Sequence, residues 1–85
     1  MDINYKITEY FEQNNLFDSQ EFNGITVKNE AGTLTISGTS RDLVELADLL
    51  VNVATDKEKS AHIHIDDLSL LNKGSDFTEV VLEKK

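Results

Sequence analysis

The clearest regular pattern of hydrophobic residues lies in residues 40–54. The residues that carry it are Leu43, Leu46, Ala47, Leu50 and Ala54. Side chains three, four and seven positions apart line one face of an α-helix. Thr39 or Ser40 can accept a hydrogen bond from the free amides of the first turn, and Asp42 places a negative charge at the positive end of the helix dipole. The sequence therefore predicts a helix over residues 40–54 that packs on a sheet.

Short segments with alternating polar and apolar residues flank this helix and predict strands. Residues 25–28 and 33–37, joined by a turn at 29–32, have the pattern of a hairpin. Residues 61–66 alternate strictly, and residues 76–82 form the last predicted strand after a loop at 67–75. In the first hairpin we expect four apolar side chains to face the helix, namely Ile25, Val27, Leu34 and Ile36.

The N-terminal segment has two interpretations. Ile3, Ile7, Tyr10 and Phe11 have helical spacing, with Asp2 as a possible cap and an end near Asn14 and Asn15. Ile3, Tyr5 and Ile7 also alternate as in a strand, so residues 3–13 stay open between helix and strand. We favour the helix. The apolar arc of the 40–54 helix is wider than one sheet needs, and we expect the N-terminal helix to cover part of it, in preference to another protomer or a partner.

These elements predict one α+β domain over residues 1–85. Residues 1–24 form a helix plus a loop, and residues 25–82 form a ββαββ core. The expected architecture has two layers, with a four-stranded, mostly antiparallel sheet packed on the 40–54 helix. A chain of 85 residues has a thin core, so a partner or a homodimer would complete it.

The composition indicates where in the cell the protein is expected to act. The chain has no cysteine, which excludes disulfides, a thiolate nucleophile and cysteine-ligated zinc. The first residues lack the basic and apolar runs of a signal peptide, and no segment approaches the roughly 20 apolar residues that span a bilayer. We therefore expect a cytoplasmic protein with no membrane partner.

Charge narrows the choice of partner. Sixteen acidic and eight basic residues give a formal net charge of −8. Binding of nucleic acid needs Lys and Arg to displace phosphate counterions, so nucleic acid is not expected as a ligand. The same field would attract a basic protein partner. Acidity that serves solubility alone remains the alternative.

One constellation suggests chemistry. His62 and His64 project from the same face of a predicted strand, where they could share a metal ion with Asp66. The chain has no other histidine, so we expect no metal site and no cofactor, and the pair would only make this face sensitive to pH. Asp66 and Asp67 are adjacent and diverge on a strand, which opposes acid–base cooperation. No Gly-x-Ser-x-Gly elbow or glycine-rich phosphate loop occurs, so an enzyme is not expected.

Residues 34–81 resemble the immunity protein 32 family of bacterial polymorphic toxin systems. The resemblance is carried by residues 34–38 (LTISG), by Leu43, Leu46, Ala47 and Leu50, by residues 62–66 (HIHID), and by residues 71–75 (LNKGS). It implies a non-enzymatic inhibitor that binds the active domain of its toxin and protects the producing cell. Such toxins are often nucleases, and an acidic inhibitor can occupy a basic, phosphate-binding groove.

Two surfaces are candidates for contact with a toxin. One is the outer sheet face, with Thr33, Thr35, His62, His64 and Asp66. The other is the polar stripe of the helix, with Glu45 and Asp48, together with the loop that begins at Asp67. Two other functions stay open. One is a structural, self-associating domain, and the other is a small-molecule or metal-binding module that uses His62 and His64.

Overall fold

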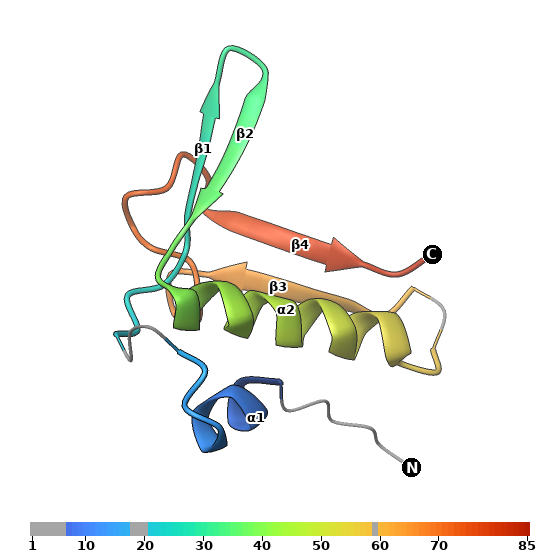
Figure 1. The fold of residues 1–85 in the computed structure, drawn as a ribbon. Helices are drawn as coiled ribbons and strands as arrows, with labels where there is room; N and C mark the ends of the chain where they lie inside the picture. The colour runs from blue at the N-terminus through green and yellow to red at the C-terminus, as the bar shows by residue number, and fades with distance from the viewer. Residues whose placement is uncertain (1–6, 18–20, 59) are drawn as a thin grey trace.

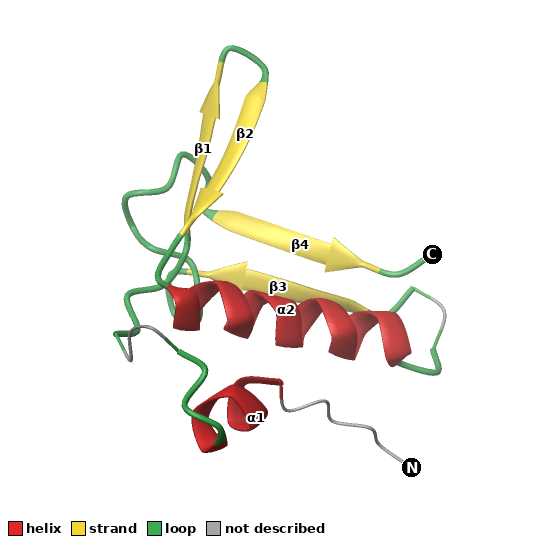
Figure 2. Ribbon diagram, in the orientation of Figure 1, coloured by secondary structure: helices red, strands yellow, loops and turns green. Residues whose placement is uncertain are grey.

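A computed structural model describes residues 7–17, 21–58 and 60–85 of the chain. Its elements are α1 (Ile7–Gln13), β1 (Thr26–Glu30), β2 (Thr33–Ser37), α2 (Ser40–Thr55), β3 (His62–Asp66) and β4 (Glu79–Glu83). Figure 1 shows their course along the chain, and Figure 2 distinguishes the two helices from the four strands. The α+β class and the order hairpin, helix, hairpin agree with the prediction.

The arrangement of the strands differs from the prediction. β1 pairs only with β2 and β3 pairs only with β4, both antiparallel, so the described strands form two small sheets instead of one four-stranded sheet. β1 has no third strand beside it because the loop after β3 occupies its outer edge, where Ile25 and Leu71 form a parallel bridge. The β1–β2 hairpin therefore extends away from the layers formed by α1, α2 and β3–β4 (Figure 1).

The hydrophobic core lies where the two hairpins meet the loop after β3. Its buried members are Ile25, Val27, Ile65, Leu70 and Leu71, and the partly buried Leu46, Leu49, Ile63, Val80 and Leu82 pack against them. Helix α2 thus contributes Leu46 and Leu49 to this core. Val53 is also buried, one turn further along the same side of α2.

The predicted inner face of α2 was partly wrong. Leu43 and Leu50 are 43% and 48% exposed, whereas the side chain of Asp42 is fully buried. The buried side of α2 begins at Asp42 because its carboxylate accepts main-chain hydrogen bonds from the loop before β1. Asp42 therefore lies on the buried side of α2, together with the partly buried Leu46 and Leu49.

The first hairpin also differs from the prediction, because only its first strand contributes buried side chains. Ile25 and Val27 are buried as expected, but Leu34 and Ile36 are 59% and 41% exposed. All five residues of β2 are exposed. Alternation placed these side chains on one face of the hairpin, but neither α1 nor α2, the helices of the described ranges, covers the part of that face that β2 contributes.

Helix α1 packs on α2, and its described part begins at Ile7. The end near Asn14 and Asn15 is confirmed, since Asn15 has a φ of 53° and the Leu16 amide donates to the Phe11 carbonyl at 2.8 Å. The proposed cap at Asp2 and the pattern at Ile3 and Tyr5 lie outside the described residues. For residues 7–13 the helical interpretation is therefore correct.

Candidate partner-binding surface

The outer face of the β3–β4 sheet carries most of the predicted site residues. His62, His64 and Asp66 alternate on β3 with the inward Ile63 and Ile65. Across the ladder, His62 lies opposite Glu83, His64 opposite Val81, and Asp66 opposite Glu79. We define the acidic face as His62, His64, Asp66, Glu79, Val81 and Glu83. It points away from the core residues Ile63 and Ile65.

Two carboxylates of the acidic face were absent from the sequence-based list. Glu79 and Glu83 both alternate with the inward-facing Val80 and Leu82, and both are exposed. Glu79 lies in the strand predicted at 76–82, but Glu83 lies one residue beyond it. The available signal was their spacing of four residues, since residues so spaced share a face when the strand continues to Glu83. The Nδ1 atom of His64 lies 3.0 Å from Glu79 Oε2, while the side chain of Glu83 projects from the opposite end of β4.

Asp66 serves mainly to shape the turn after β3. Its Oδ1 accepts from the Leu68 amide at 3.0 Å, and its main-chain carbonyl accepts from the amides of Ser69 and Leu71 at 3.1 and 3.0 Å. The Ser69 hydroxyl in turn accepts from the Asp66 amide at 3.1 Å. These bonds fix a tight turn, an arrangement that suits Asp because its short side chain reaches the amide two residues on.

The turn presents an exposed leucine. Leu70 and Leu71 are buried, but Leu68, between them and β3, is 91% exposed. The neighbouring Asp67 is also exposed. The hydrogen bonds of the turn hold this exposed apolar side chain in place at the surface. An apolar residue in a loop is expected to be covered by other side chains, and Leu68 is an exception to this expectation.

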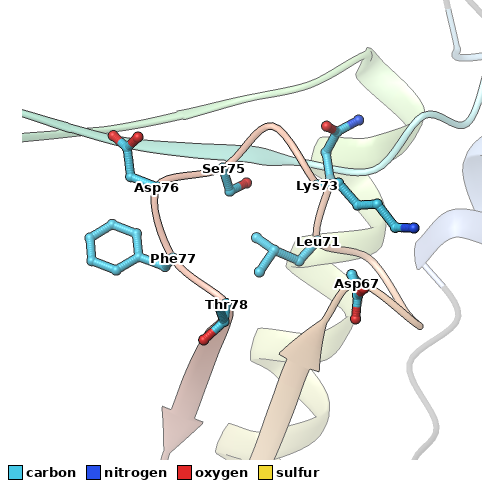
Figure 3. A pocket seen from close by; sticks show the side chains of 8 residues that line it. Asp67, Leu71, Lys73, Ser75, Asp76, Phe77 and Thr78 are labelled. Atoms are coloured by element: carbon cyan, nitrogen blue, oxygen red, sulfur yellow. The ribbon is translucent and has the colours of Figure 1, made fainter.

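A hollow opens between the end of β3 and the start of β4 (Figure 3). Its volume is about 290 Å³, and it is lined by Asp67, Leu71, Asn72, Lys73, Ser75, Asp76, Phe77 and Thr78. A second hollow of about 250 Å³ adjoins the first and includes Phe22; the two share Asp67, Leu71, Asn72 and Lys73. Phe22 and Phe77 are partly exposed at these hollows. Both hollows are lined by polar and apolar side chains together.

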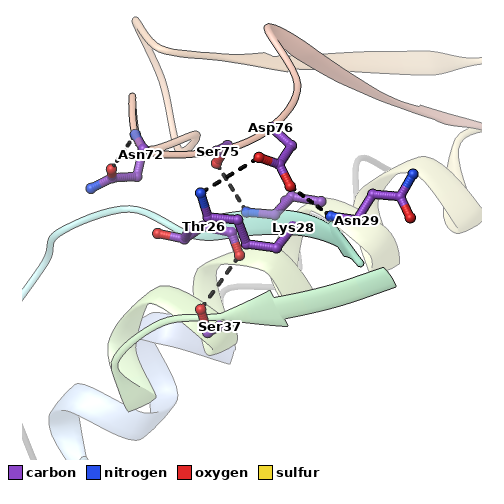
Figure 4. Close-up of polar contacts among 9 residues, drawn as sticks. Thr26, Lys28, Asn29, Ser37, Asn72, Ser75 and Asp76 are labelled. Carbon is purple, nitrogen blue, oxygen red and sulfur yellow. Dashed lines mark hydrogen bonds and ion pairs between the residues drawn. The ribbon is translucent and has the colours of Figure 1, made fainter. Parts of the chain in front are cut away.

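Three side chains pin this loop to the outer edge of β1 (Figure 4). Ser75 Oγ accepts from the Val27 amide at 2.9 Å, and an Asp76 carboxylate oxygen accepts from the Asn29 amide at 2.8 Å. Asn72 donates to the Asn23 carbonyl at 3.1 Å and accepts from the Gly74 amide at 2.8 Å. The run from Leu71 to Ser75, which carries part of the family resemblance, thus serves to shape and anchor the loop.

The charge of Asp76 is stabilised where it meets the hairpin. The hydrogen bond from the Asn29 amide lowers the pKa of Asp76 below its ordinary value, and the nearby Lys28 ammonium lowers it further. Lys28 Nζ lies 3.5 Å from Asp76 Oδ1. This carboxylate remains ionised over the physiological pH range and holds the loop against β1.

The polar stripe of α2 lies against α1. The carboxylate of Asp48 accepts the amides of Ile7 and Thr8 at 2.7 and 3.1 Å and also the Thr8 hydroxyl, so it caps the start of α1. Burial raises the pKa of Glu45, and the charge of Asp48 raises it further. Asp48 therefore stabilises the packing of α1 on α2, and Glu45 lies partly buried beside it.

Thr33 and Thr35 lie apart from the acidic face. Both belong to β2, which pairs only with β1, whereas His62 and His64 belong to β3. The predicted outer face that combined all four residues depended on a single sheet. Because the two hairpins form separate sheets, the structure does not bring these threonines and histidines together.

The histidine pair has few partners for a metal. The centroids of the two rings are 5.0 Å apart, and Glu79 Oε2 lies 3.0 Å from His64 Nδ1. Within the described ranges, no group of three or more His, Cys, Asp or Glu side chains is arranged to hold a metal ion. A structural or catalytic zinc site needs at least three protein ligands. This geometry therefore gives no support to a metal-binding function.

A buried carboxylate joins the loop and the hairpin to α2. Asp42 Oδ1 accepts from the amides of Asn23 and Gly24 at 3.0 and 2.9 Å, and Oδ2 accepts from the Thr39 amide at 3.0 Å. Burial alone raises the pKa of this carboxyl, but the hydrogen bonds from Thr39, Gly24 and Asn23 outweigh burial and lower the pKa below its ordinary value. Thr39 is the N-cap of α2, as one of the two predicted caps.

Comparison with known proteins gives one match. A family model described as Immunity protein 32 matches residues 33–85, which run from the start of β2 to the last residue. No curated protein and no solved structure matches the chain. In the described part of the chain, no helix is both long enough and apolar enough to cross a membrane.

Proposed function

The chain belongs to the immunity protein 32 family, and from this membership we propose that it binds a cognate bacterial toxin and neutralises it without catalysing a reaction. The family match is the observation that carries the proposal. It spans 53 of the 85 residues and includes β3, β4 and the loop between them. A cytoplasmic location, where such an inhibitor would meet its toxin, remains a prediction.

We propose that the toxin contacts the acidic face and the adjoining turn. Glu79 and Glu83 offer exposed carboxylates there, and Asp67 adds another beside the hollow. Leu68 supplies an exposed apolar contact on the same turn. Apolar centres with a polar rim are the usual anatomy of a protein interface. In this proposal Asp66 and Ser75 position the turn and the loop, and they need not touch the toxin.

The charge of the chain supports a basic partner. A net charge of −8 favours encounter with a positively charged surface and opposes binding to phosphate chains. A nuclease must offer Lys and Arg to its substrate, so carboxylates placed over that groove would exclude the nucleic acid. We therefore propose a basic, nuclease-type toxin domain as the target. Inhibition would follow from occupation of the groove, and no bond would be made or broken.

The test is the rate of association with a purified candidate toxin domain, measured by biolayer interferometry at increasing salt. Exposed charges act mainly on the encounter, so we expect the association rate to fall steeply with salt while the dissociation rate changes little. Binding with an association rate that does not change with salt would contradict a basic target. Absence of saturable binding would contradict the toxin partner itself.

Matched charge variants locate the surface. We expect Glu79→Gln combined with Glu83→Gln to slow association several-fold, because both carboxylates lie on the acidic face. Glu30→Gln combined with Glu58→Gln removes the same charge from the tip of the first hairpin and from the connection after α2. If both double variants slow association equally, the acidic face is not the contact surface.

A further inference from the structure

We propose that two copies of this chain pair through β2, as antiparallel neighbours related by a twofold axis at Thr35. This inference rests on the β1–β2 hairpin alone and is independent of the proposed toxin. The self-association that the sequence left open would then have a defined surface and a defined register. The argument starts from the hydrogen-bonding groups at the two edges of the hairpin.

The two edges of the hairpin differ. In an antiparallel pair, alternate residues direct their main-chain N–H and C=O groups toward the partner strand or away from it. On β1 the outward groups are those of Val27 and Asn29, and the 72–76 loop satisfies them through Ser75 and Asp76. Val27 is paired with Ile36 and Asn29 with Leu34, so the outward groups on β2 belong to Ile36 and Leu34.

The outer edge of β2 is open. No hydrogen bond joins the main chain of Leu34 or Ile36 to the rest of the described chain beyond the hairpin. Figure 1 shows the hairpin extending away from α2 and β4, so another strand can approach it. An unpaired strand edge of this kind is a template for pairing with a further chain.

β2 lacks the devices that usually block such pairing. Natural edge strands carry charged residues, proline or a bulge. Residues 31–40 contain no Asp, Glu, Lys or Arg, and the chain has no proline. This is the longest uncharged stretch in a chain with 28% charged residues and a net charge of −8. β2 is therefore where two copies can come together with the least repulsion.

The sequence of β2 is complementary to itself in one register. With Thr35 opposite its own copy, Leu34 lies opposite Ile36 of the second copy and Thr33 lies opposite Ser37. The outward groups of Leu34 and Ile36 then form hydrogen-bonded pairs, and Thr35 forms the pair without hydrogen bonds. Leu34 and Ile36 of both copies share one face, and their partial burial against each other stabilises the pairing. A second copy of this chain therefore fits the edge in both hydrogen bonding and side-chain chemistry.

A cysteine scan tests the register. In a pair without hydrogen bonds, the Cα atoms are about 4.5 Å apart, which suits a disulfide. We expect Thr35→Cys to form a covalent dimer under mild oxidation, of twice the 9.5 kDa chain mass. Thr33→Cys is the matched control, because the two copies of residue 33 would be offset by about 13 Å along the strands. The natural chain has no cysteine to interfere.

The outcome is read on a non-reducing gel and by mass spectrometry, with circular dichroism to check that both variants fold. Rapid crosslinking at residue 35 and its near absence at residue 33 would support the proposal. Equal crosslinking of the two variants would overturn it, because random collision would then account for the dimer. No crosslinking at residue 35 would also overturn it, leaving the edge to another partner or to none.

A second measurement uses charge on the uncrosslinked protein. Thr35→Lys places two ammonium groups opposite each other at the twofold axis, and like charges directly opposite destabilise a strand pair. We expect sedimentation velocity to show a dimer for the natural chain at high concentration and only monomer for this variant. Thr78→Lys makes the same substitution at an exposed residue outside β2 and should keep the dimer. Equal loss of the dimer in both variants, or a natural chain that stays monomeric, would contradict pairing through β2.

Discussion

The two hairpins of this protein have strands of equal length but very different cover. Each consists of two five-residue strands in antiparallel register. In the β3–β4 hairpin, Ile65 is fully buried beneath α2, whereas in the β1–β2 hairpin Leu34 and Ile36 remain exposed. Alternation determines which side chains share a face. What covers that face depends on other segments of the chain.

Burial of β1 follows from a distant loop. Ile25 forms a β-bridge with Leu71, and the main chain of Val27 is hydrogen-bonded to Ser75 and Asp76. The loop after β3 therefore satisfies the hydrogen-bonding groups at the outer edge of β1. β2 lies on the far side of the hairpin and receives no such cover. The β1–β2 hairpin thus has one strand attached to the protein and one strand exposed to partners.

The largest expected difference between the hairpins concerns their isoleucines. Ile65→Ala should lower the free energy of unfolding by about 2–5 kcal/mol, because it leaves a cavity in the core. Ile36→Ala should lower it by less than about 1 kcal/mol, since Ile36 is already 41% exposed. Urea denaturation of both variants checks this contrast. The measurement is made at a concentration where the chain is monomeric, and equal losses there would contradict the exposure of β2 in the single chain.

The next largest expected difference in stability is between glycine substitutions at the two ends of the first hairpin, Gly24 before β1 and Gly32 in the β1–β2 turn. Gly24 has a φ of +81°, and an added Cβ would lie 2.6 Å from the Leu70 carbonyl oxygen. Gly24→Ala should therefore cost roughly 2–4 kcal/mol through strain and overpacking. Gly32 at the turn has a φ of +87° but nothing within 4 Å of an added Cβ, so Gly32→Ala should cost only about 1 kcal/mol. Thermal unfolding that ranks Gly32→Ala as the more damaging change would contradict the attachment of the loop at Gly24.

The Asp42 carboxylate links α2 to the loop before β1, and its contribution to stability depends on pH. Asp42→Asn should cost about 1–3 kcal/mol near neutral pH, because the buried amides of Asn23 and Gly24 lose their charged acceptor. The pKa of the folded state lies below the ordinary value of 3.8, so the carboxylate stabilises the fold above that pH. This stabilisation is lost as pH falls through the folded-state pKa.

Denaturant unfolding of the natural chain and the Asp42→Asn variant over a range of acidic pH tests this linkage. The difference in unfolding free energy between the two proteins should shrink as pH falls below about 4. A difference that stays constant or grows on acidification would show that Asp42 is not a stabilising carboxylate.

The smallest expected difference in stability is between substitutions of two serines, one that contacts β1 and one in β2. Ser75→Ala removes the acceptor for the Val27 amide and should cost about 1 kcal/mol. Ser37→Ala removes only a long contact of 3.5 Å to the Thr26 carbonyl and should change the stability very little. Hydrogen exchange of the Val27 amide gives a direct local measurement. Unchanged protection in Ser75→Ala would contradict the pinning of the loop.

The sequence predicted what depends on local patterns. Helix α2 with its cap at Thr39, both hairpins, the end of α1 near Asn15 and the outward direction of His62 and His64 all follow from spacing and residue type. Each requires only neighbours in the sequence or across a short turn. For the same reason, Glu79 and Glu83 could have been placed on the face shared with the histidines.

The remaining features depend on contacts between distant residues. Asp48 and Asp66 were predicted to be free contact residues, but one caps a helix some 40 positions away and the other shapes its own turn. The burial of Asp42 depends on a loop that precedes it by 18 positions or more. An acidic residue has the same appearance in a sequence whether its carboxylate meets solvent or a buried amide. This is why the candidate site was only partly predictable.

Neutralisation of the toxin is the central claim, and growth of cells that produce the toxin tests it most directly. A candidate toxin domain that binds this chain is induced in a host that lacks the chain, with and without co-production of the chain. We predict that co-production restores growth and that the Glu79→Gln, Glu83→Gln variant restores it less well at equal abundance. Failure of the natural, folded chain to restore growth would contradict the assignment of this protein as the inhibitor of that toxin.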